Sequence, residues 1–490
     1  MPPLKPLQAN PGEAASGALF RSRNSTGRPK SHKQREDLGV QAQQTGRQPA
    51  LARLAKPIPR AGPFEWLIRT LRMRNEALAL TERMYERHGP VVLESVGFMK
   101  SVSLFGPDAN KFVMLDRENN LSAKGAWDLI MGRIFSNGLL LMDGDEHRYQ
   151  RRIMQQAFST PALESYVEQM NSRIAEGIRD WHQHGPGFLA FPAFKKLTLN
   201  LAASVFLGIE LGPLTDQMNR AFENTVAASM SVVRLRIPGL EFYRGLVGRE
   251  WMIEFFRSLL PAKRSSNGSD MLSRFCHAQS EDGRRFTDDE IVDHMIFLMM
   301  AAHDTTTSTL TSMLFELGRR PEWQERLREE SRGLGSDVLA FADMDRLTAL
   351  GWVMQETLRR YPPLSTVPRL ATREFEYEGY RIPARALIVV FPIHTHHMKE
   401  WWSDPYQFDP ERFSDARAEH RRHSHSWVPY SGGAHTCIGL RFAELQIKSI
   451  LHQLLLRTRW SVPAGYEMPV QQAPISKPRD GLPVSFERIG

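Results

Sequence analysis

The chain has 490 residues, of which 41% are hydrophobic, enough to bury a large core. It holds only two cysteines, which excludes a disulfide-stapled fold and is typical of a reducing compartment. The formal net charge of +8 comes from residues 1–60, which carry 11 Lys and Arg against 3 Asp and Glu. The remainder has 52 of each sign, so a nucleic-acid-binding body is not indicated.

Residues 1–60 are rich in Pro, Gly, Gln, Ser and Arg and show little hydrophobic periodicity. This composition predicts a disordered basic tail, and an organelle transit peptide is the alternative. No window approaches the roughly 18 to 20 apolar residues of a membrane span, and the N-terminus lacks the apolar core of a signal peptide. We therefore expect a cytoplasmic protein without a transmembrane segment, ordered from about residue 61.

Helix and strand alternate after the tail. Residues 64–88 have the periodicity of a helix, and two short strands follow at 91–96 and 101–105. A later helix contains His147 and Arg151, which are i, i+4 neighbours on one face. These two side chains could hold an anionic group together, and a solvated helix face is the alternative.

The central part of the chain shows no nucleotide-binding motif. Residues 160–260 form several helical segments with a break at 237–239. Cys276 follows in a polar loop without CxxC or Cys/His spacing, so a zinc site is not expected. Neither a Walker loop nor a dinucleotide-binding glycine pattern occurs, and no flavin or nicotinamide module is evident.

The longest predicted helix starts at the capping box of residues 287–290, Thr-Asp-Asp-Glu. It continues for roughly 32 residues, or about 48 Å, which crosses a whole domain. In its middle an apolar run gives way to Ala301, Ala302, Asp304 and Thr305. Small side chains leave room for a ligand there, and a threonine hydroxyl can bond to the carbonyl four residues earlier. A buried helix with a satisfied polar patch is the alternative.

Another helix, over about 346–361, contains Glu356 and Arg359. Most such i, i+3 pairs are surface salt bridges of little energetic value. Arg369 lies in an extended stretch behind this helix, before strand-like segments and an aromatic, proline-rich meander that contains Arg412. The strand-like segments and the meander are residues 375–380, 386–392 and 401–413.

The stretch 430–439, Tyr-Ser-Gly-Gly-Ala-His-Thr-Cys-Ile-Gly, places Cys437 in a glycine-rich loop directly before an amphipathic helix. A thiolate needs compensation, which backbone N–H groups near a helix N-terminus supply. Gly433 and Gly439 permit sharp bends and a close approach to a flat ligand. A buried thiolate held in this way suits an axial ligand of haem iron. For the loop alone, a structural buried cysteine is the alternative.

The order of these patterns is more specific than any one of them. The acid–threonine pair, the Glu356 helix, the meander arginine and Cys437 follow one another at intervals of 51, 56 and 25 residues. Together they resemble the signature of the cytochrome P450 family, from about residue 62 onward. Within the family the chain is most similar to the bacterial branch related to sterol demethylases and cyanobacterial retinoid hydroxylases. The resemblance implies a single domain over 61–490, mainly α with small β-sheets, a triangular prism whose long central helix crosses the haem.

The resemblance also implies roles for individual residues. Cys437 is implied as the axial ligand of the iron of haem b, and Asp304 with Thr305 as the pair that delivers protons during O2 activation. A buried ion-paired triad is implied to brace the cysteine loop, and other residues to contact cofactor or substrate. The triad is Glu356, Arg359 and Arg412. The residues implied to bind the two propionates of the haem are His147, Arg151, Arg369 and His435, and further implied cofactor contacts are Tyr430, Gly433, Gly439, Ala301 and Ala302. The implied substrate pocket includes Phe297, Met300, Leu364 and Val367, with the segments 119–141 and 222–243 beside it.

Three positions depart from the family's usual pattern. Tyr430 stands where Phe is usual, which brings a hydroxyl toward the thiolate side. Ala302 replaces the commoner Gly, and His147 with Arg151 replaces the usual Trp with Arg. None of these differences removes a catalytic group.

The resemblance implies a monomeric monooxygenase that inserts one oxygen atom of O2 into a lipophilic substrate, such as a terpenoid, steroid or fatty-acid-like molecule. Electrons from NAD(P)H are expected to arrive through a ferredoxin reductase and a small acidic ferredoxin. A peroxygenase or hydroperoxide isomerase is one alternative, against which the Asp304–Thr305 pair argues, and a non-catalytic haem-binding relative is another. The basic residues that could face the ferredoxin are Arg148, Arg152, Arg441 and Lys448.

Overall fold

The computed structural model describes residues 56–96, 99–135, 137–229, 231 and 233–489. Contacts divide the chain into a unit of residues 1–52 and a unit of residues 53–490. The predicted tail over 1–60 falls almost wholly outside the described residues and stays a prediction, as does the single domain over 61–490. The first described residues already pair with the second unit's strands, through bridges from Lys56 to Tyr380 and from Arg60 to Leu93.

Helices make up most of the described chain, which confirms the predicted class of a mainly α fold with small sheets. Helix α1 ends at His88, before Gly89, as the sequence indicated. None of the described helices is long and apolar enough to span a bilayer. The helices are α1 (Pro63–His88), α2 (Pro107–Leu115), α3 (Ala123–Met131), α4 (Gly144–Gln155), α5 (Thr160–Ile178), α6 (Ala190–Ala202), α7 (Thr215–Ser229), α8 (Glu241–Arg264), α9 (Met271–His277), α10 (Asp288–Gly318), α11 (Pro321–Arg332), α12 (Thr348–Arg360), α13 (Pro392–Thr395) and α14 (Leu440–Arg457).

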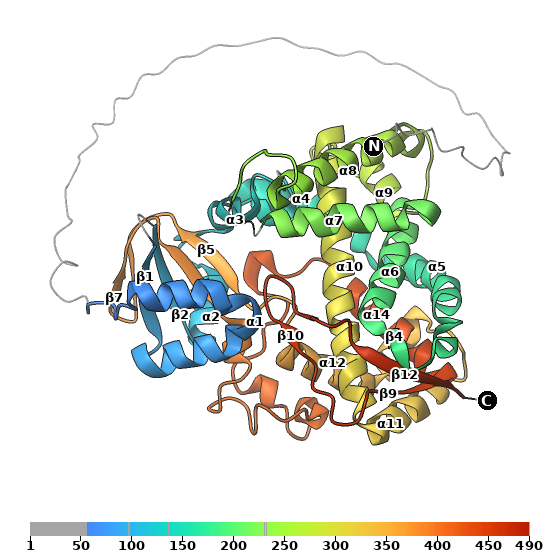
Figure 1. The fold of residues 1–490 in the computed structure, drawn as a ribbon. Coiled ribbons are helices and arrows are strands. Elements are labelled where there is room, and N and C mark those ends of the chain that lie inside the picture. The colour runs from blue at the N-terminus through green and yellow to red at the C-terminus, as the bar shows by residue number, and fades with distance from the viewer. Residues whose placement is uncertain (1–55, 97–98, 136, 230, 232, 490) are drawn as a thin grey trace, which may run out of the picture. The chain divides into compact units, whose positions relative to one another are not determined.

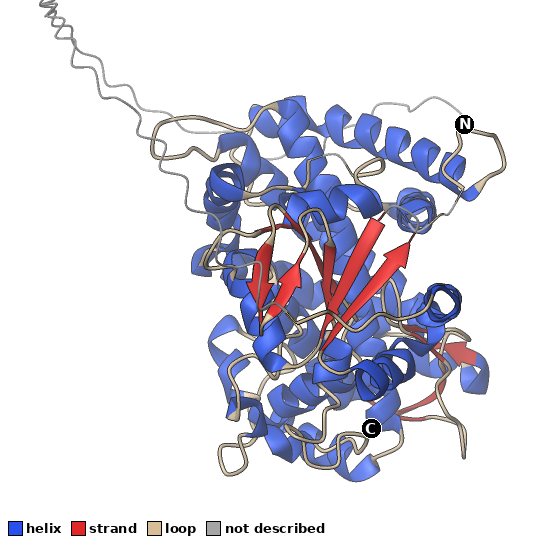
Figure 2. Cartoon of the chain, turned by 90° about the vertical axis from the view of Figure 1, so that its left-hand side faces the viewer, coloured by secondary structure: helices blue, strands red, loops and turns tan. Residues whose placement is uncertain are grey.

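The described strands form four small sheets, of which the largest faces the viewer in Figure 2. Its order is β1-β2-β8-β5-β3, antiparallel except for the parallel pair β2–β8. Buried Val102 and Ile388 pair across β2 and β8 and pack into one apolar cluster. The strands are β1 (Val91–Val96), β2 (Met99–Leu104), β3 (Leu121–Ser122), β4 (Phe188–Leu189), β5 (Val367–Ala371), β6 (Phe375–Tyr377), β7 (Tyr380–Ile382), β8 (Leu387–Val390), β9 (Thr458–Ser461), β10 (Val470–Gln471), β11 (Lys477–Pro478) and β12 (Pro483–Arg488).

Helix α10 is the helix around which the others pack. Its predicted capping box is present, because the Thr287 hydroxyl accepts from the Glu290 N–H at 3.2 Å and the Glu290 carboxylate accepts from the Thr287 N–H at 2.8 Å. The helix ends at Gly318, before Pro321. It contacts α6, α8, α12 and α14, and Figure 1 shows it running between them. Its middle therefore lies inside the core.

Two local predictions are corrected. Cys276 lies on α9 and is 1% exposed, rather than in a polar loop. Asp270 caps this helix by accepting from the Ser273 N–H at 3.0 Å, and Cys276 then packs among apolar side chains. The second strand begins at Met99 instead of 101. No group of three or more potential metal-binding side chains occurs within the described ranges.

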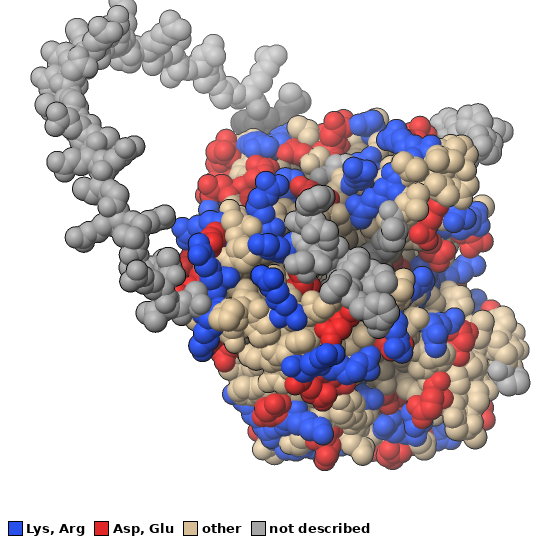
Figure 3. Space-filling view, turned by 60° about the vertical axis from the view of Figure 1, so that its left-hand side comes forward, with Lys and Arg blue, Asp and Glu red and all other residues tan. Residues whose placement is uncertain are grey.

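Charged side chains of both signs lie on the surface of the described part of the chain. On the face drawn in Figure 3, acidic and basic side chains are interspersed over the described residues. Many exposed charged side chains among the described residues form ion pairs, such as Lys124 with Asp128 at 2.7 Å. Exposed pairs of this kind contribute little to stability.

Candidate active site

A mostly apolar cavity lies between α10, α4, β5 and the loop that precedes α14. Cys437 opens onto it, together with aromatic and aliphatic side chains from these elements. Most of the predicted site residues meet here, although they come from four separate parts of the chain. The predicted residues that line the cavity are His147, Arg151, Phe297, Ala301, Ala302, Thr305, Leu364, Val367, Arg369, Tyr430, His435, Cys437 and Gly439.

The Cys437 loop shapes the proximal wall of the cavity. The Cys437 N–H donates to the Tyr430 carbonyl at 3.0 Å, which closes the loop on itself. Burial raises the pKa of the Cys437 thiol, whereas a hydrogen bond from the Gly439 backbone and the charge of Arg151 lower it. The thiol is a free cysteine and faces the cavity. The loop thus provides a soft sulfur ligand with a backbone donor beside it.

The basic side chains converge on the same cavity. The rings of His147 and His435 lie 4.1 Å apart, centroid to centroid. Burial and the charge of Arg151 lower the pKa of His147 to about 4, and burial with the charge of Arg369 lowers the pKa of His435 to about 3. Burial also lowers the pKa of Arg369 to about 10, and its Nη2 is buried without a hydrogen-bond partner among the described residues. The carboxylate of Asp143 lies 4.0 Å from Nε2 of His435, and its charge acts in the opposite direction by raising the pKa of His147 and Arg369.

Asp304 and Thr305 point in different directions. Thr305 lines the cavity and donates to the Ala301 carbonyl at 2.7 Å, the bond that the sequence suggested. Asp304 does not line the cavity. Its Oδ1 lies 3.4 Å from Nζ of Lys195, a 6% exposed side chain on α6. Consecutive helical residues are about 100° apart, so the two side chains cannot share one face.

Lys195 extends this arrangement toward the surface. Its Nζ also donates to Glu223 of α7 at 2.8 Å, and the Glu223 side chain is 49% exposed. His303 completes the surroundings of Asp304, with Nε2 3.3 Å from Oδ1. The sequence offered one signal for Lys195, a lysine within the apolar run of α6, but nothing that linked it to Asp304.

The predicted triad is assembled and fully buried. Arg359 binds Glu356 at 2.7 and 2.9 Å, and Nε of Arg412 lies 3.2 Å from the same carboxylate. Arg412 also pairs with Glu419 at 2.9 Å, a fourth member that the sequence patterns did not reveal. Arg359 reaches the His396 carbonyl at 2.6 Å and so ties α12 to the chain that leads into the meander. The network fixes the backbone before the cysteine loop.

Three expected contacts are not made. Met300 is not among the residues that line the cavity, and its side chain is 8% exposed within the core. Gly433 faces α2, because a Cβ there would lie 2.1 Å from the Met114 carbonyl oxygen, and its φ of +62° also favours glycine. Within the segment 222–243, the described residues do not line the cavity, and Phe222 packs against His303 instead.

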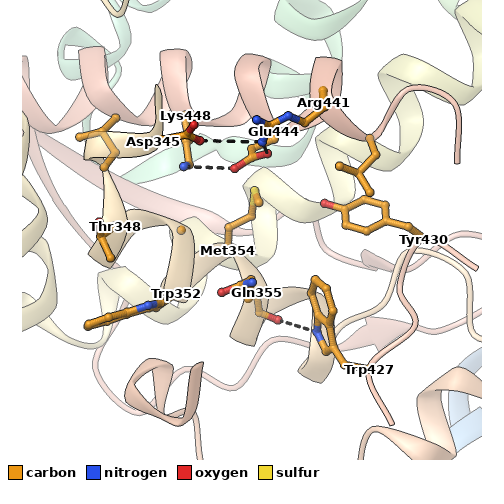
Figure 4. A pocket seen from close by; sticks show the side chains of 13 residues that line it. Asp345, Thr348, Trp352, Met354, Gln355, Trp427, Tyr430, Arg441, Glu444 and Lys448 are labelled. Carbon is orange, nitrogen blue, oxygen red and sulfur yellow. Dashed lines mark hydrogen bonds and ion pairs between the residues drawn. The ribbon is translucent and has the colours of Figure 1, made fainter. Parts of the chain in front are cut away.

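A second recess, of about 400 Å³, lies behind the cysteine loop between α12 and α14. Figure 4 shows the Tyr430 hydroxyl pointing into it. Tyr430 therefore forms a wall between this recess and the cavity. Burial, and to a lesser extent the charge of Cys437, raises the pKa of the Tyr430 phenol.

Lys448 also lines this recess and is 4% exposed, with Nζ 2.9 Å from the Met344 carbonyl and 3.2 Å from Glu444. It is unavailable to a partner surface, contrary to expectation.

Known proteins share the sequence pattern and the fold of this chain. The family model described as "Cytochrome P450" matches residues 55–484. "Putative cytochrome P450 136" of Mycobacterium tuberculosis is 39% identical over 406 residues, 82% of each chain. "Taxane 10-beta-hydroxylase" of Taxus cuspidata is 26% identical over 87% of this chain and 88% of that protein. The solved structure "Retinoic acid bound cyanobacterial CYP120A1" superposes with a TM-score of 0.81 at 25% identity, covering 89% of this chain and all of that one.

These matches extend over nearly the whole described fold, and the similar proteins include hydroxylases. The relationship predicted from four separated motifs is therefore confirmed. The chain belongs to the cytochrome P450 family and is a monooxygenase of that family.

Proposed function

We propose that the cavity holds haem b with Cys437 as the axial thiolate ligand. The observation that carries this proposal is that Cys437, a free thiol, and Arg369, whose Nη2 has no hydrogen-bond partner among the described residues, line the same cavity. A flat apolar macrocycle with two carboxylates matches both features. When bound, the haem would supply O2 activation, and its thiolate ligand would favour O–O cleavage.

The chain's own residues divide the remaining tasks. Arg369, Arg151 and the two neighbouring histidines hold the carboxylates, and Ala301 with Ala302 leave room for the macrocycle beside α10. Thr305 places a hydroxyl at the cavity, and the carboxylate of its neighbour Asp304 points away from the cavity toward Lys195. The apolar lining excludes bulk water from the reacting substrate.

We propose a lipophilic substrate of the terpenoid, steroid or fatty-acid-like kind. Phe297, Leu364 and Val367 line the cavity, and Trp127, Leu139 and Leu140 from the predicted 119–141 segment join them. Similar proteins are named for taxane and abscisic acid hydroxylation, and the matched structure for bound retinoic acid. All of these are lipophilic compounds, which supports the same class here.

We propose that electrons from NAD(P)H reach the haem through a ferredoxin reductase and an acidic ferredoxin, which docks on the cysteine side. Arg148 and Arg152 are each 64% exposed on α4, and Arg441 is 52% exposed on α14.

Charge reversal of Arg148 and Arg152 is expected to slow the reduction of the protein by ferredoxin and to weaken the dependence of that rate on salt, because opposite charges steer association. Stopped-flow reduction at several salt concentrations measures both, and unchanged rates would contradict the assignment. The monomeric state and cytoplasmic location stay predictions.

The spectrum of the reduced protein with carbon monoxide tests the haem assignment directly. The wild type is expected to show the strongly red-shifted Soret band of thiolate-ligated haem, and Cys437→Ser is expected to lose it. Cys276→Ser provides the matched control, since Cys276 is buried on α9 away from the cavity lining. An unshifted band in the wild type, or equal loss in both variants, would remove Cys437 as ligand. Product formation with peroxide alone would favour the peroxygenase alternative.

A further inference from the structure

Arg234 joins two parts of the chain that are far apart in sequence. It lies in the segment between α7 and α8, and its guanidinium donates to four backbone carbonyls. Nη1 reaches Leu129 at 2.9 Å and Nη2 reaches Ile130 at 3.0 Å, both on α3. Nη2 and Nε also reach Ser229 and Ser231, each at 3.2 Å. One side chain therefore spans α3 and the end of α7.

The chemistry of these acceptors suits a guanidinium. The last carbonyls of a helix have no intrahelical partner, and they carry the negative end of the helix dipole. Leu129 and Ile130 stand in the last turn of α3, and Ser229 is the last residue of α7. The planar guanidinium of arginine presents five N–H donors in a fixed geometry, whereas the ammonium of lysine is a compact charge with three rotatable donors. Arg234 thus caps two helices with one charge.

Helix α3 is a wall of the cavity, because its Trp127 lines it. The start of this helix is fixed separately: the Ser122 hydroxyl accepts from the Gly125 N–H at 2.7 Å, and Asp143 accepts from the Ala123 N–H at 2.9 Å. Among the described residues, the side-chain bonds that hold the end of α3 come from Arg234. Loss of those bonds would free that end while the start stays anchored.

We propose that Arg234 is a positioning residue that holds α3, and with it Trp127, against the substrate cavity. By holding α3 in place, Arg234 sets the rate at which ligands enter the cavity and the selectivity of the cavity wall for one ligand over another. The inference rests on the proposed function, because it takes this cavity as the substrate site. Arg234 itself does not line the cavity and acts through α3.

Arg234→Met tests this assignment, and Arg236→Met is its matched control. Arg236 lies two residues away, is exposed, and makes no side-chain bond within the described segments. In the purified holoenzyme, the amides of residues 123–131 are expected to exchange hydrogen about tenfold faster in Arg234→Met, since opening would no longer break hydrogen bonds to a charged donor. The control is expected to match the wild type.

Ligand entry supplies the second readout. Stopped-flow binding of a phenyl-substituted imidazole and of carbon monoxide is expected to become about tenfold faster in Arg234→Met, with faster release of the imidazole. Unchanged exchange and binding, or equal changes in Arg236→Met, would overturn the proposal. If Arg234→Met does not fold, Arg234→Lys makes the same test, and wild-type behaviour of that variant overturns it. Absence of haem from the wild type would refute the proposed function, whereas the exchange experiment would still decide the role of Arg234.

Discussion

Replacing Glu356 with alanine is expected to destabilise the protein by about 3 to 5 kcal/mol, the usual cost of removing one partner of a buried ion pair. Arg412 would keep the carboxylate of Glu419, whereas Arg359 would keep backbone carbonyls and the ring of Trp402 but no carboxylate among the described residues. Both guanidiniums are 0% exposed, so water cannot compensate. Such a loss is a large part of the roughly 5–15 kcal/mol that holds a typical protein folded.

Glu411→Ala is the matched control, because Glu411 lies in the same meander but pairs at the surface. Its carboxylate is 2.7 Å from Arg326, with the two side chains 52% and 43% exposed. Removal of this pair is expected to cost about 1 kcal/mol or less. Urea denaturation followed by circular dichroism compares the two variants with the wild type. If Glu356→Ala unfolds at the same urea concentration as Glu411→Ala, the buried network does not have the role assigned to it.

Local signals in the sequence predicted most of the fold. The Thr287–Glu290 capping box and Pro321 bracket α10 because both act within one turn of the chain. The pairing of β2 with β8 could not be predicted in this way, since the partners lie almost 300 residues apart. Cys276 was placed wrongly because α9 is short, and its polar flanks hid the buried face of the helix.

The candidate site, like the fold, contains residues that the sequence indicated and residues that it did not. The spacing of motifs indicated Cys437 and Thr305, and the family resemblance implied Arg369; the structure brings all three to one cavity. The spacing did not indicate Lys195, because its contact with Asp304 joins two segments that are far apart in the sequence. It did not indicate Glu419 either, which lies seven residues after Arg412 and belongs to none of the motifs. The different directions of Asp304 and Thr305 follow from helical geometry alone, so a helical projection of the sequence would have separated them.

Replacing Asp304 with asparagine is expected to lower the turnover number about 100-fold while haem and substrate binding remain, because a positioned acid–base group contributes at least that much. Asn cannot exchange a proton with Lys195, which now stands 3.4 Å away. Lys195 in turn contacts Glu223, which is half-exposed, so Glu223, Lys195 and Asp304 form a path for protons from the surface to the residue before Thr305 on α10.

Thr305→Ala interrupts this proton path at the cavity and is expected to divert electrons into hydrogen peroxide.

Lysine substitutions show whether this path carries protons or merely supports the helix. Lys195→Met keeps the aliphatic volume of a buried side chain but removes the cation, and we expect about a tenfold lower turnover number. Lys196→Met changes the exposed neighbour on α6 and is expected to leave turnover unaltered. The solvent deuterium isotope effect on turnover is expected to rise in Lys195→Met and Asp304→Asn, because proton delivery then limits the rate. Wild-type isotope effects and peroxide yields in both variants would mean that protons reach Thr305 by another route, and that Lys195 serves only to neutralise a buried carboxylate.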